Sequence, residues 1–296
     1  VFRVECGEMS EDDKAFFKKL WFNGLGEFFY RNGIKTDIDS FVSIDAPEPK
    51  NIPQCEDYVS SGIEIVPVGG GKDSAVTTEL LRPFGDKLRF FTVNDQPART
   101  QCVLAGGYSE DKIIKIYRTI DPELLKRNAE GFLNGHTPFS SVVAFISMYA
   151  GFIEGANDVI LSNESSANES NIGGESVNHQ YSKSFEFERD FDEFRRRNFP
   201  QSAVYFSLLR PFCELQIAKQ FSQYKQYHPI FRSCNRGSKK NIWCCECPKC
   251  LFVAIMLSPF LPPDELSSIF GCDMLAKTEL ETDFDGLCGF TGLKPF

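Results

Sequence analysis

The sequence predicts an α/β fold with a doubly wound parallel sheet, followed by a cysteine-rich, helical C-terminal part. Short apolar segments alternate with helix-patterned segments between residues 63 and 162, the order expected of parallel strands joined by helical crossovers. Polar residues collect where these apolar segments end, and five cysteines lie between residues 234 and 250. In such sheets ligands bind beyond the carboxyl ends of the strands, so we expect the functional site there.

The N-terminal segment, residues 1–60, is predicted to be a small helical cap or the end of a preceding domain. An amphipathic pattern begins near Glu11 and includes Phe16 and Leu20. Residues 36–60 carry three prolines among polar residues and are expected to form a loop. We expect this segment to be incomplete, because the sequence opens on Val1.

Residues 61–232 are predicted to form one nucleotide-binding domain. Thr137 as N-cap, Pro138 at the first helical position and Gly155 after the end delimit its last crossover helix. That helix is too short for a membrane span, which needs about 20 residues. Strands are expected at 63–68, 88–94, 112–117 and 158–162, and helices at 74–81, 96–105, 122–129 and 139–153.

The turn between the first strand and the first helix has the composition of an anion-binding loop. Three glycines at 69–71 accept positive φ and let backbone N–H groups approach a phosphate, and the helix N-terminus adds its dipole. Lys72 adds a positive charge, Ser74 a hydroxyl, and Asp73 a carboxylate able to hold Mg²⁺. A Walker A loop is excluded, because it requires serine or threonine after the lysine. The alternative is a glycine-rich hairpin or helix cap.

Polar side chains follow two of the predicted strands. Asn94 ends the second strand, and the run 162–169 after the last strand contains Glu164 among amides and hydroxyls. A further polar run contains His179 and Lys183. Ordinary strand-to-helix caps are the alternative interpretation of each.

The cysteine spacing in the C-terminal part, residues 233–296, predicts a structural zinc site. Cys-x9-Cys-x2-Cys-x2-Cys supplies the four thiolates of a tetrahedral site, with Cys245 as an alternative to the second cysteine. Reduced core cysteines are the competing interpretation. We expect this part to be cut short at its end. The predicted ligands are Cys234, Cys244, Cys247 and Cys250.

The composition argues against nucleic acid as a partner. A net charge of −9 and a pI near 5.0 do not suit a polyanion bound across the whole surface. We expect no signal peptide, because the first residues are charged, and eleven cysteines in this arrangement are typical of metal ligands and reduced thiols. We predict a cytoplasmic protein with no membrane partner, and the oligomeric state is left open.

Four motifs in series together resemble the MurL family. They are residues 67–74, 162–169, 177–184 and 247–250. The first is similar to the PP-loop Ser-Gly-Gly-x-Asp-Ser of the ATP pyrophosphatase superfamily, with Gly69 in place of the first serine. The resemblance covers roughly residues 60–296. It implies an adenine nucleotide alpha hydrolase-like fold that cleaves ATP between its α- and β-phosphates.

The resemblance further implies an ATP-dependent epimerase of UDP-N-acetylmuramoyl-L-alanyl-L-glutamate in peptidoglycan precursor synthesis. Adenylation of the terminal glutamate acidifies its Cα–H, and inversion and hydrolysis then give D-glutamate, AMP and pyrophosphate. The implied cofactors are ATP, Mg²⁺ held by Asp73, and structural Zn²⁺. The candidate catalytic residues are His179, Glu164, His136 and Lys183, with Mg²⁺ coordination as the other role of Glu164. The candidate nucleotide-binding residues are Gly69, Gly70, Gly71, Lys72, Asp73, Ser74 and Asn94.

Several basic residues have two interpretations. Arg210 could hold phosphate, and the block Arg195 to Arg197 could bind a UDP group or form a solvated helix face. His228, which precedes a proline, is predicted to be structural.

Two other functions remain open at this point. A PP-loop synthase that modifies a deazaguanine or tRNA base through adenylation would share the loop and the cysteine cluster. A non-catalytic zinc-ribbon interaction module would have a degenerate loop, against which the intact residues 72–74 argue.

Overall fold

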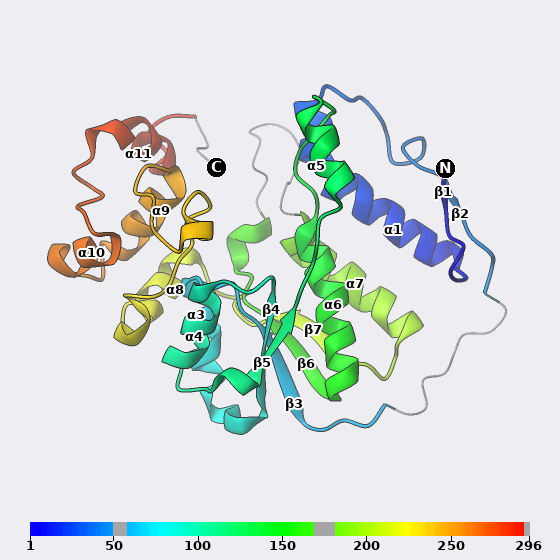
Figure 1. Cartoon of the computed structure of the whole chain (residues 1–296), viewed down its shortest axis with the longest axis horizontal. Coiled ribbons are helices and arrows are strands. Elements are labelled where there is room, and N and C mark those ends of the chain that lie inside the picture. Colours follow the sequence, from blue (N-terminus) through cyan, green and yellow to red (C-terminus); the bar gives the residue numbers. More distant parts are fainter. Residues whose placement is uncertain (50–57, 169–180, 293–296) are drawn as a thin grey trace. The chain divides into compact units, whose positions relative to one another are not determined.

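The computed structural model describes residues 1–49, 58–168 and 181–292 (Figure 1). The chain forms two compact units, each assembled from several segments. The first contains Val1–Ser61, Arg118–Asn157 and Ala167–Tyr205, and the second contains Gly62–Tyr117, Asp158–Ser166 and Phe206–Phe296. The division into 1–60, 61–232 and 233–296 is a division along the chain and stays a prediction.

A five-stranded sheet has the order β5-β4-β3-β6-β7. Its β3/β4 and β4/β5 pairs are parallel, with Phe90 opposite Val66 on one side and Ile113 on the other. All three side chains are buried. The α/β class and the parallel sheet are therefore confirmed. The strands are β3 (Ile63–Pro67), β4 (Leu88–Val93), β5 (Ile113–Ile116), β6 (Ala156–Leu161) and β7 (Val204–Ser207).

Strands are added to the sheet first on one side of β3 and then on the other. From β3 the chain moves outward through β4 to β5, and it then returns to place β6 on the other side of β3. Loops that leave neighbouring strands at such a reversal point diverge, which opens a crevice at the carboxyl ends. The loops after β3 and β6 are the two at this point.

Helices of the second unit enclose a large apolar core. Phe90, Phe221 and Leu251 are completely or almost completely buried within it, and α3 packs against α8. The helices are α3 (Lys72–Leu80), α4 (Pro97–Ala105), α8 (Glu214–Phe221), α9 (Pro248–Leu257), α10 (Pro263–Phe270) and α11 (Glu281–Leu287).

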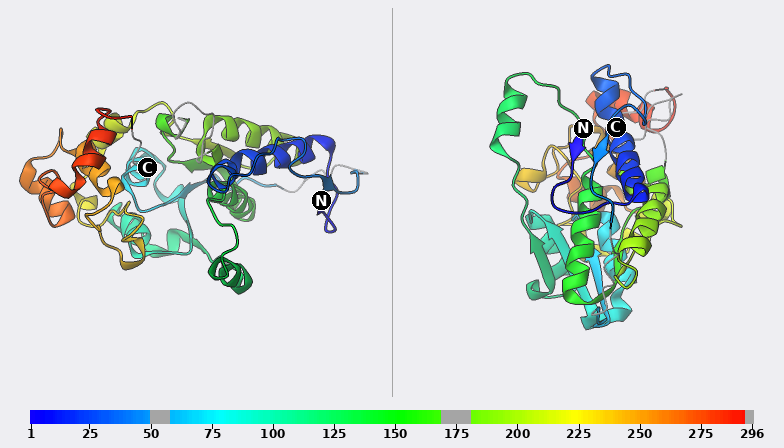
Figure 2. Two further views of the ribbon diagram at one scale, coloured as in Figure 1. Left: turned by 90° about the horizontal axis from the view of Figure 1, so that it is seen from above. Right: turned by 90° about the vertical axis from the view of Figure 1, so that its right-hand side faces the viewer.

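The first unit has a core of stacked phenylalanines. Phe16 of α1 stacks on Phe194 of α7 with ring centroids 4.7 Å apart, and Phe145 of α6 contacts both rings. Figure 2 shows α1 beside α7 in both views. The elements are β1 (Phe2–Arg3), α1 (Glu11–Gly24), α2 (Gly26–Arg31), β2 (Ile44–Asp45), α5 (Pro122–Ala129), α6 (Phe139–Glu154) and α7 (Phe185–Asn198).

One predicted helix start is wrong by one residue. Pro138 is the N-cap of α6 and Phe139 is its first residue, so Thr137 lies outside the helix. The reason is local: the non-helical ψ of 66° at Pro138 points its carbonyl at the N–H and hydroxyl of Ser141, which donate to it. Gly155 follows the helix end with φ +66°, as predicted. Among the described residues, every helix is too short or too polar to cross a membrane.

Candidate functional site

The glycine loop, residues 68–71, joins β3 to α3 at the carboxyl end of the sheet. Gly70 has φ +82°, and a Cβ there would lie 3.1 Å from the backbone of Ala98 on α4. A Cβ on Gly71 would lie 2.7 Å from the hydroxyl of Ser233. Gly70 therefore requires glycine, whereas a side chain at Gly71 would require the Ser233 hydroxyl to move. Gly69 is exposed and its Cβ would meet nothing within 4 Å, so this position has room for the serine of the PP-loop pattern.

Lys72, the first residue of α3, is buried and held by two carboxylates. Its Nζ lies 2.5 Å from Oδ1 of Asp73 and also contacts Oε2 of Glu214, while only 3% of the residue is exposed. Burial alone would lower the pKa of Lys72, but Asp73 and Glu214 outweigh it and raise the pKa above its ordinary value. The ammonium of Lys72 is therefore charged, and it is paired with carboxylates of the protein itself.

Glu214 is a site residue that sequence reasoning missed. It is the first residue of α8 and lies 142 positions from Lys72 along the chain. Burial raises the pKa of Glu214, Lys72 opposes this effect, and the charges of Asp73 and Glu164 add to it. A glutamate at a helix N-terminus is common for helix-dipole reasons alone, so no sequence signal distinguishes it.

Glu164 follows β6 and is held by residues near β7. Arg210 donates from Nη1 to the carbonyl oxygen of Glu164 over 3.0 Å, and the Ser166 hydroxyl donates to its carboxylate over 2.6 Å. Asn163 donates to the hydroxyl of Ser207, also over 3.0 Å. The structure thus brings Glu164 into the same unit as the glycine loop, close enough for its charge to act on Glu214.

Asn94 occupies the turn after β4, the neighbour of β3. Its φ is +52°, a conformation that asparagine tolerates better than most residues. Arg99 of α4 donates from Nη1 to the carbonyl oxygens of Val93 and Asn94, and Asp95 accepts from Thr100 over 2.7 Å. The side chains of Arg99 and Asp95 therefore stabilise the conformation of this turn beside the glycine loop.

Ser74 is turned toward its own loop. Its hydroxyl donates to the carbonyl oxygen of Gly71 over 3.0 Å, and 5% of the residue is exposed. This is the bond from a serine hydroxyl to a backbone carbonyl three residues earlier, and it engages the hydroxyl within the first turn of α3. The predicted phosphate contact of Ser74 stays a prediction.

The four predicted cysteine ligands meet in one cluster. Sγ of Cys247 lies 3.5 Å from that of Cys250 and 4.0 Å from that of Cys234, and Cys244 lies 3.8 Å from Cys250. All four sulfur atoms are within 4.8 Å of one another. A tetrahedral zinc ion with bonds of about 2.3 Å separates its sulfur ligands by about 3.8 Å, which these distances match.

Cys245 does not belong to the cluster. Its backbone has φ +57°, which turns the side chain away, and its thiol donates to the carbonyl oxygen of Phe270 over 3.3 Å. Burial raises the pKa of Cys245 to about 12. In contrast, burial of Cys234 is outweighed by the N–H groups of Cys244 and Gly237, which lower the pKa of its thiol to about 7.

Comparison with known proteins finds similar sequences along almost the whole chain. Residues 2–208 match the MurL N-terminal domain, and residues 230–296 match the MurL C-terminal domain. The chain belongs to the MurL family. It is 34% identical over 99% of its length to a "UDP-N-acetyl-alpha-D-muramoyl-L-alanyl-L-glutamate epimerase" of Xanthomonas oryzae pv. oryzae, and 33% identical over 97% to the protein of that name from a Micromonospora species.

The chain spans 65% of the length of these two MurL relatives. A solved structure, "U34-tRNA thiolase NcsA from Methanococcus maripaludis with its [4Fe-4S] cluster", aligns over 98% of this chain and 85% of its own. Its sequence identity is 9% and the TM-score is 0.35, so nothing about fold or function is inferred from it.

Two of the remaining predicted catalytic residues of this MurL-family chain belong to the first unit. They are His136, half-buried before α6, and Lys183, the exposed last residue of a short 3₁₀ turn. His179 lies outside the described residues. The catalytic roles of these three and of Glu164 stay predictions.

The other basic residues and the third histidine have partners in the structure. Arg195 pairs with Asp192 over 2.8 Å, and Arg197 lies 3.4 Å from Asp13, so these two arginines stabilise the first unit. His228 is buried, and this burial lowers its pKa; its ring nitrogen lies 3.4 Å from the carbonyl oxygen of Phe221.

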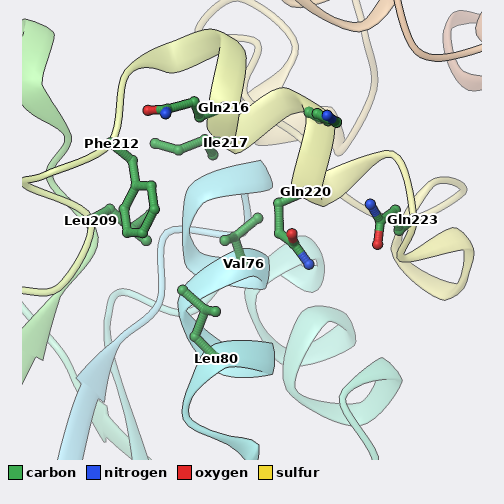
Figure 3. A pocket seen from close by; sticks show the side chains of 9 residues that line it. Val76, Leu80, Leu209, Phe212, Gln216, Ile217, Gln220 and Gln223 are labelled. Atoms are coloured by element: carbon green, nitrogen blue, oxygen red, sulfur yellow. The ribbon is translucent and has the colours of Figure 1, made fainter.

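A pocket of about 210 Å³ opens between α3 and α8 (Figure 3). Val76 and Leu80 line it from α3, and Ile217 lines it from α8. Val76 is one helical turn from Lys72, and Ile217 is one turn from Glu214. The pocket is therefore adjacent to the ion pair of Lys72 and Glu214, which joins the two helices.

Proposed function

We propose that this chain carries out the ATP-dependent epimerisation of the terminal L-glutamate of UDP-N-acetylmuramoyl-L-alanyl-L-glutamate. The observation that carries the proposal is its identity of 33–34% with proteins of that name over nearly its whole length. The protein would then be an isomerase of peptidoglycan precursor synthesis with a UDP-linked muramoyl dipeptide as substrate. Its cytoplasmic location stays a prediction.

The glycine loop supports ATP as co-substrate. Gly70 leaves no room for a side chain, and the loop leads into the N-terminus of α3, so backbone N–H groups and the helix dipole would face the phosphates. Asp73 is half-buried in the first turn of α3 and would hold Mg²⁺. When bound, the cation neutralises phosphate charge during transfer. We infer from this arrangement a PP-loop form of a doubly wound sheet.

The chemistry follows from the acidity of the substrate. Removing the Cα proton of a free carboxylate places a second negative charge beside the first, which makes that carbon a very weak acid. Attack of a carboxylate oxygen on the α-phosphorus of ATP expels pyrophosphate and forms an acyl-adenylate without that charge. A base then takes the Cα proton, and a proton returns on the opposite face. Water then cleaves the acyl-adenylate, which gives AMP and the UDP-linked dipeptide with a terminal D-glutamate residue.

The chain's own residues divide between the two half-reactions. Asp73 and the glycine loop would act in adenylation, whereas proton transfer requires a different group near the strand ends. Glu164, beside Arg210 after β6, is the candidate in the same unit as the loop. His136, His179 and Lys183 are the other candidates.

The test of the proposal is direct. The chain is incubated with ATP, Mg²⁺ and the UDP-dipeptide, and the AMP formed is quantified. The dipeptide is then hydrolysed, and the chirality of the released glutamate is analysed. We expect AMP to form and D-glutamate to accumulate together. ATP cleavage with the glutamate remaining entirely in the L form would contradict the proposal.

We also propose that the four-cysteine cluster holds one structural Zn²⁺. With all four positions of a tetrahedral site taken by thiolates, the cation would have no open position for substrate. Its contribution is to the fold, because it joins Cys234 to the N-terminus of α9.

Cys247→Ser is expected to lower the zinc content and the thermal stability of the second unit. Metal analysis of the unmodified chain should find about one Zn²⁺ per chain. Cys288→Ser, which alters an exposed cysteine outside the cluster, is the matched control and should leave both quantities unchanged. A metal-free chain that melts at the same temperature with and without added zinc would reject the site.

A further inference from the structure

The amino end of α3 carries a charge arrangement that the nucleotide-binding role does not by itself require. One ammonium, Nζ of Lys72, contacts carboxylates from two helices: Asp73 on α3 at 2.5 Å and Glu214 on α8. The Lys72 side chain is 4% exposed, whereas the side chains of Glu214 and Asp73 are 20% and 37% exposed. The lysine is therefore the inner member of the group and Asp73 is the outer member.

A lysine in this position presents a problem for Asp73. If Asp73 were its only partner, the ammonium would neutralise the carboxylate on which a divalent cation depends. A second carboxylate on the same ammonium restores a net negative charge, because the three charges of −1, +1 and −1 sum to −1 at the amino end of α3. The burial of Lys72 strengthens these interactions, since solvent screens them little.

Apolar packing and charge both join α3 to α8. The two helices pack together through buried residues such as Val76 and Ile217, and the pocket between them begins about one turn from both Lys72 and Glu214 (Figure 3). The ion pair adds a charged link between the amino end of α8 and that of α3. Breaking a buried pair of this kind leaves an uncompensated charge.

We propose that Glu214 is a positioning residue of the nucleotide site, which balances the charge of Lys72 so that Asp73 keeps its negative charge for a divalent cation. Lys72 accordingly acts as an internal counter-ion and not as a phosphate ligand. This role rests on the proposed function, because it assigns the cation to Asp73. It also explains why Glu214, far away in the sequence, contacts Lys72 directly after the glycine loop.

The test compares two single variants. Both should lower the stability of the fold, but they should change the Kd for a divalent cation in opposite directions. Mn²⁺ replaces Mg²⁺ as the probe, and its free concentration is measured by electron paramagnetic resonance in the presence of ATP and without the dipeptide. In Glu214→Gln the ammonium has Asp73 as its one remaining carboxylate, so the Kd for Mn²⁺ should rise about tenfold or more. In Lys72→Met two carboxylates lose their counter-ion, and the Kd should fall. Both variants should melt several degrees lower than the parent.

A purely structural role predicts a different outcome, in which both variants bind Mn²⁺ more weakly in proportion to their loss of stability. That result would overturn the proposal. If either single variant fails to fold, the double variant Lys72→Met/Glu214→Gln decides, because it leaves neither of the two charges in place. Its Kd should be no higher than that of the parent, and a tenfold rise would overturn the proposal.

The control is Glu265→Gln, which breaks the exposed pair of Lys225 and Glu265 in the same unit. Its melting temperature and Kd should equal those of the parent. A parent chain that binds Mn²⁺ with ATP but never inverts glutamate would refute the proposed function alone. A parent chain with no ATP-dependent Mn²⁺ binding would refute the positioning role.

Discussion

Asp73→Asn is expected to abolish ATP-dependent pyrophosphate release while the chain remains folded. Asparagine has nearly the same shape and can still contact Lys72 through its amide oxygen, but it carries no charge for the cation. The side chain is 37% exposed, so the change leaves little buried charge uncompensated. Loss of one electrostatic contact at a reacting phosphate is expected to reduce turnover by on the order of 100-fold or more.

The measurement is a coupled pyrophosphate assay on purified protein, with thermal melting as the check on folding. Asp86→Asn is the matched control, because Asp86 is fully exposed in the same unit, away from the glycine loop. Pyrophosphate release by Asp73→Asn at the parent rate would refute the nucleotide assignment.

Lys72→Ala shows how the structure changes an expectation. From the sequence alone, this substitution would be expected to remove turnover and leave the fold intact. In the structure it removes the shared counter-ion of Asp73 and Glu214 and leaves space beside the pocket. Breaking a buried pair from one side costs about 3–5 kcal/mol of folding free energy. We therefore expect lower stability as well as lower turnover, and Asp73→Asn is the cleaner probe of catalysis.

Epimerisation in D₂O is expected to place deuterium at the glutamate Cα. If an acyl-adenylate acidifies this position, the base that takes the proton exchanges with solvent before a proton returns. Mass spectrometry of the product should then show one added mass unit in essentially every inverted glutamate. A synthase that modifies a base has no such stereocentre and would cleave ATP without this label. A chain that consumes ATP with its dipeptide and never labels the glutamate is not an epimerase.

Replacing the true base should separate the two half-reactions. Label incorporation should fall by about 100-fold or more, while pyrophosphate release continues, because adenylation uses a different group. The variants are His179→Ala, Glu164→Gln and His136→Ala, and Cys288→Ser, which changes an exposed residue, serves as the control. If all three candidates exchange the Cα proton at the parent rate, the assignment of the base is wrong even though the family is right.

Much of the fold could be predicted because the signals that encode it are local. The predicted strand beginning at Ile63 and the glycine turn after it depend on neighbours within a few residues, and both are present in the structure. The helix start at Thr137 was wrong by one residue, since a single ψ angle at Pro138 decides it. Strand β7 was missed, because its four residues carry little periodic pattern of their own.

The candidate site was predictable only in part. Asp73 could be proposed because it follows the glycine loop, and Glu164 because it follows a predicted strand. Glu214 could not, because its role depends on the meeting of α3 with α8, and no local pattern records which helices meet.

By itself, the sequence determined the α/β class, the position of the glycine loop and the set of cysteines from which a metal cluster could form. These depend on periodicity, backbone freedom and spacing, which are properties of short segments. The tertiary structure alone decided that Cys244 and not Cys245 joins the cluster, because a backbone φ of +57° turns Cys245 toward Phe270. It alone decided that Lys72 is buried between Asp73 and Glu214, because the partner of a charge is chosen by packing between residues far apart in the chain.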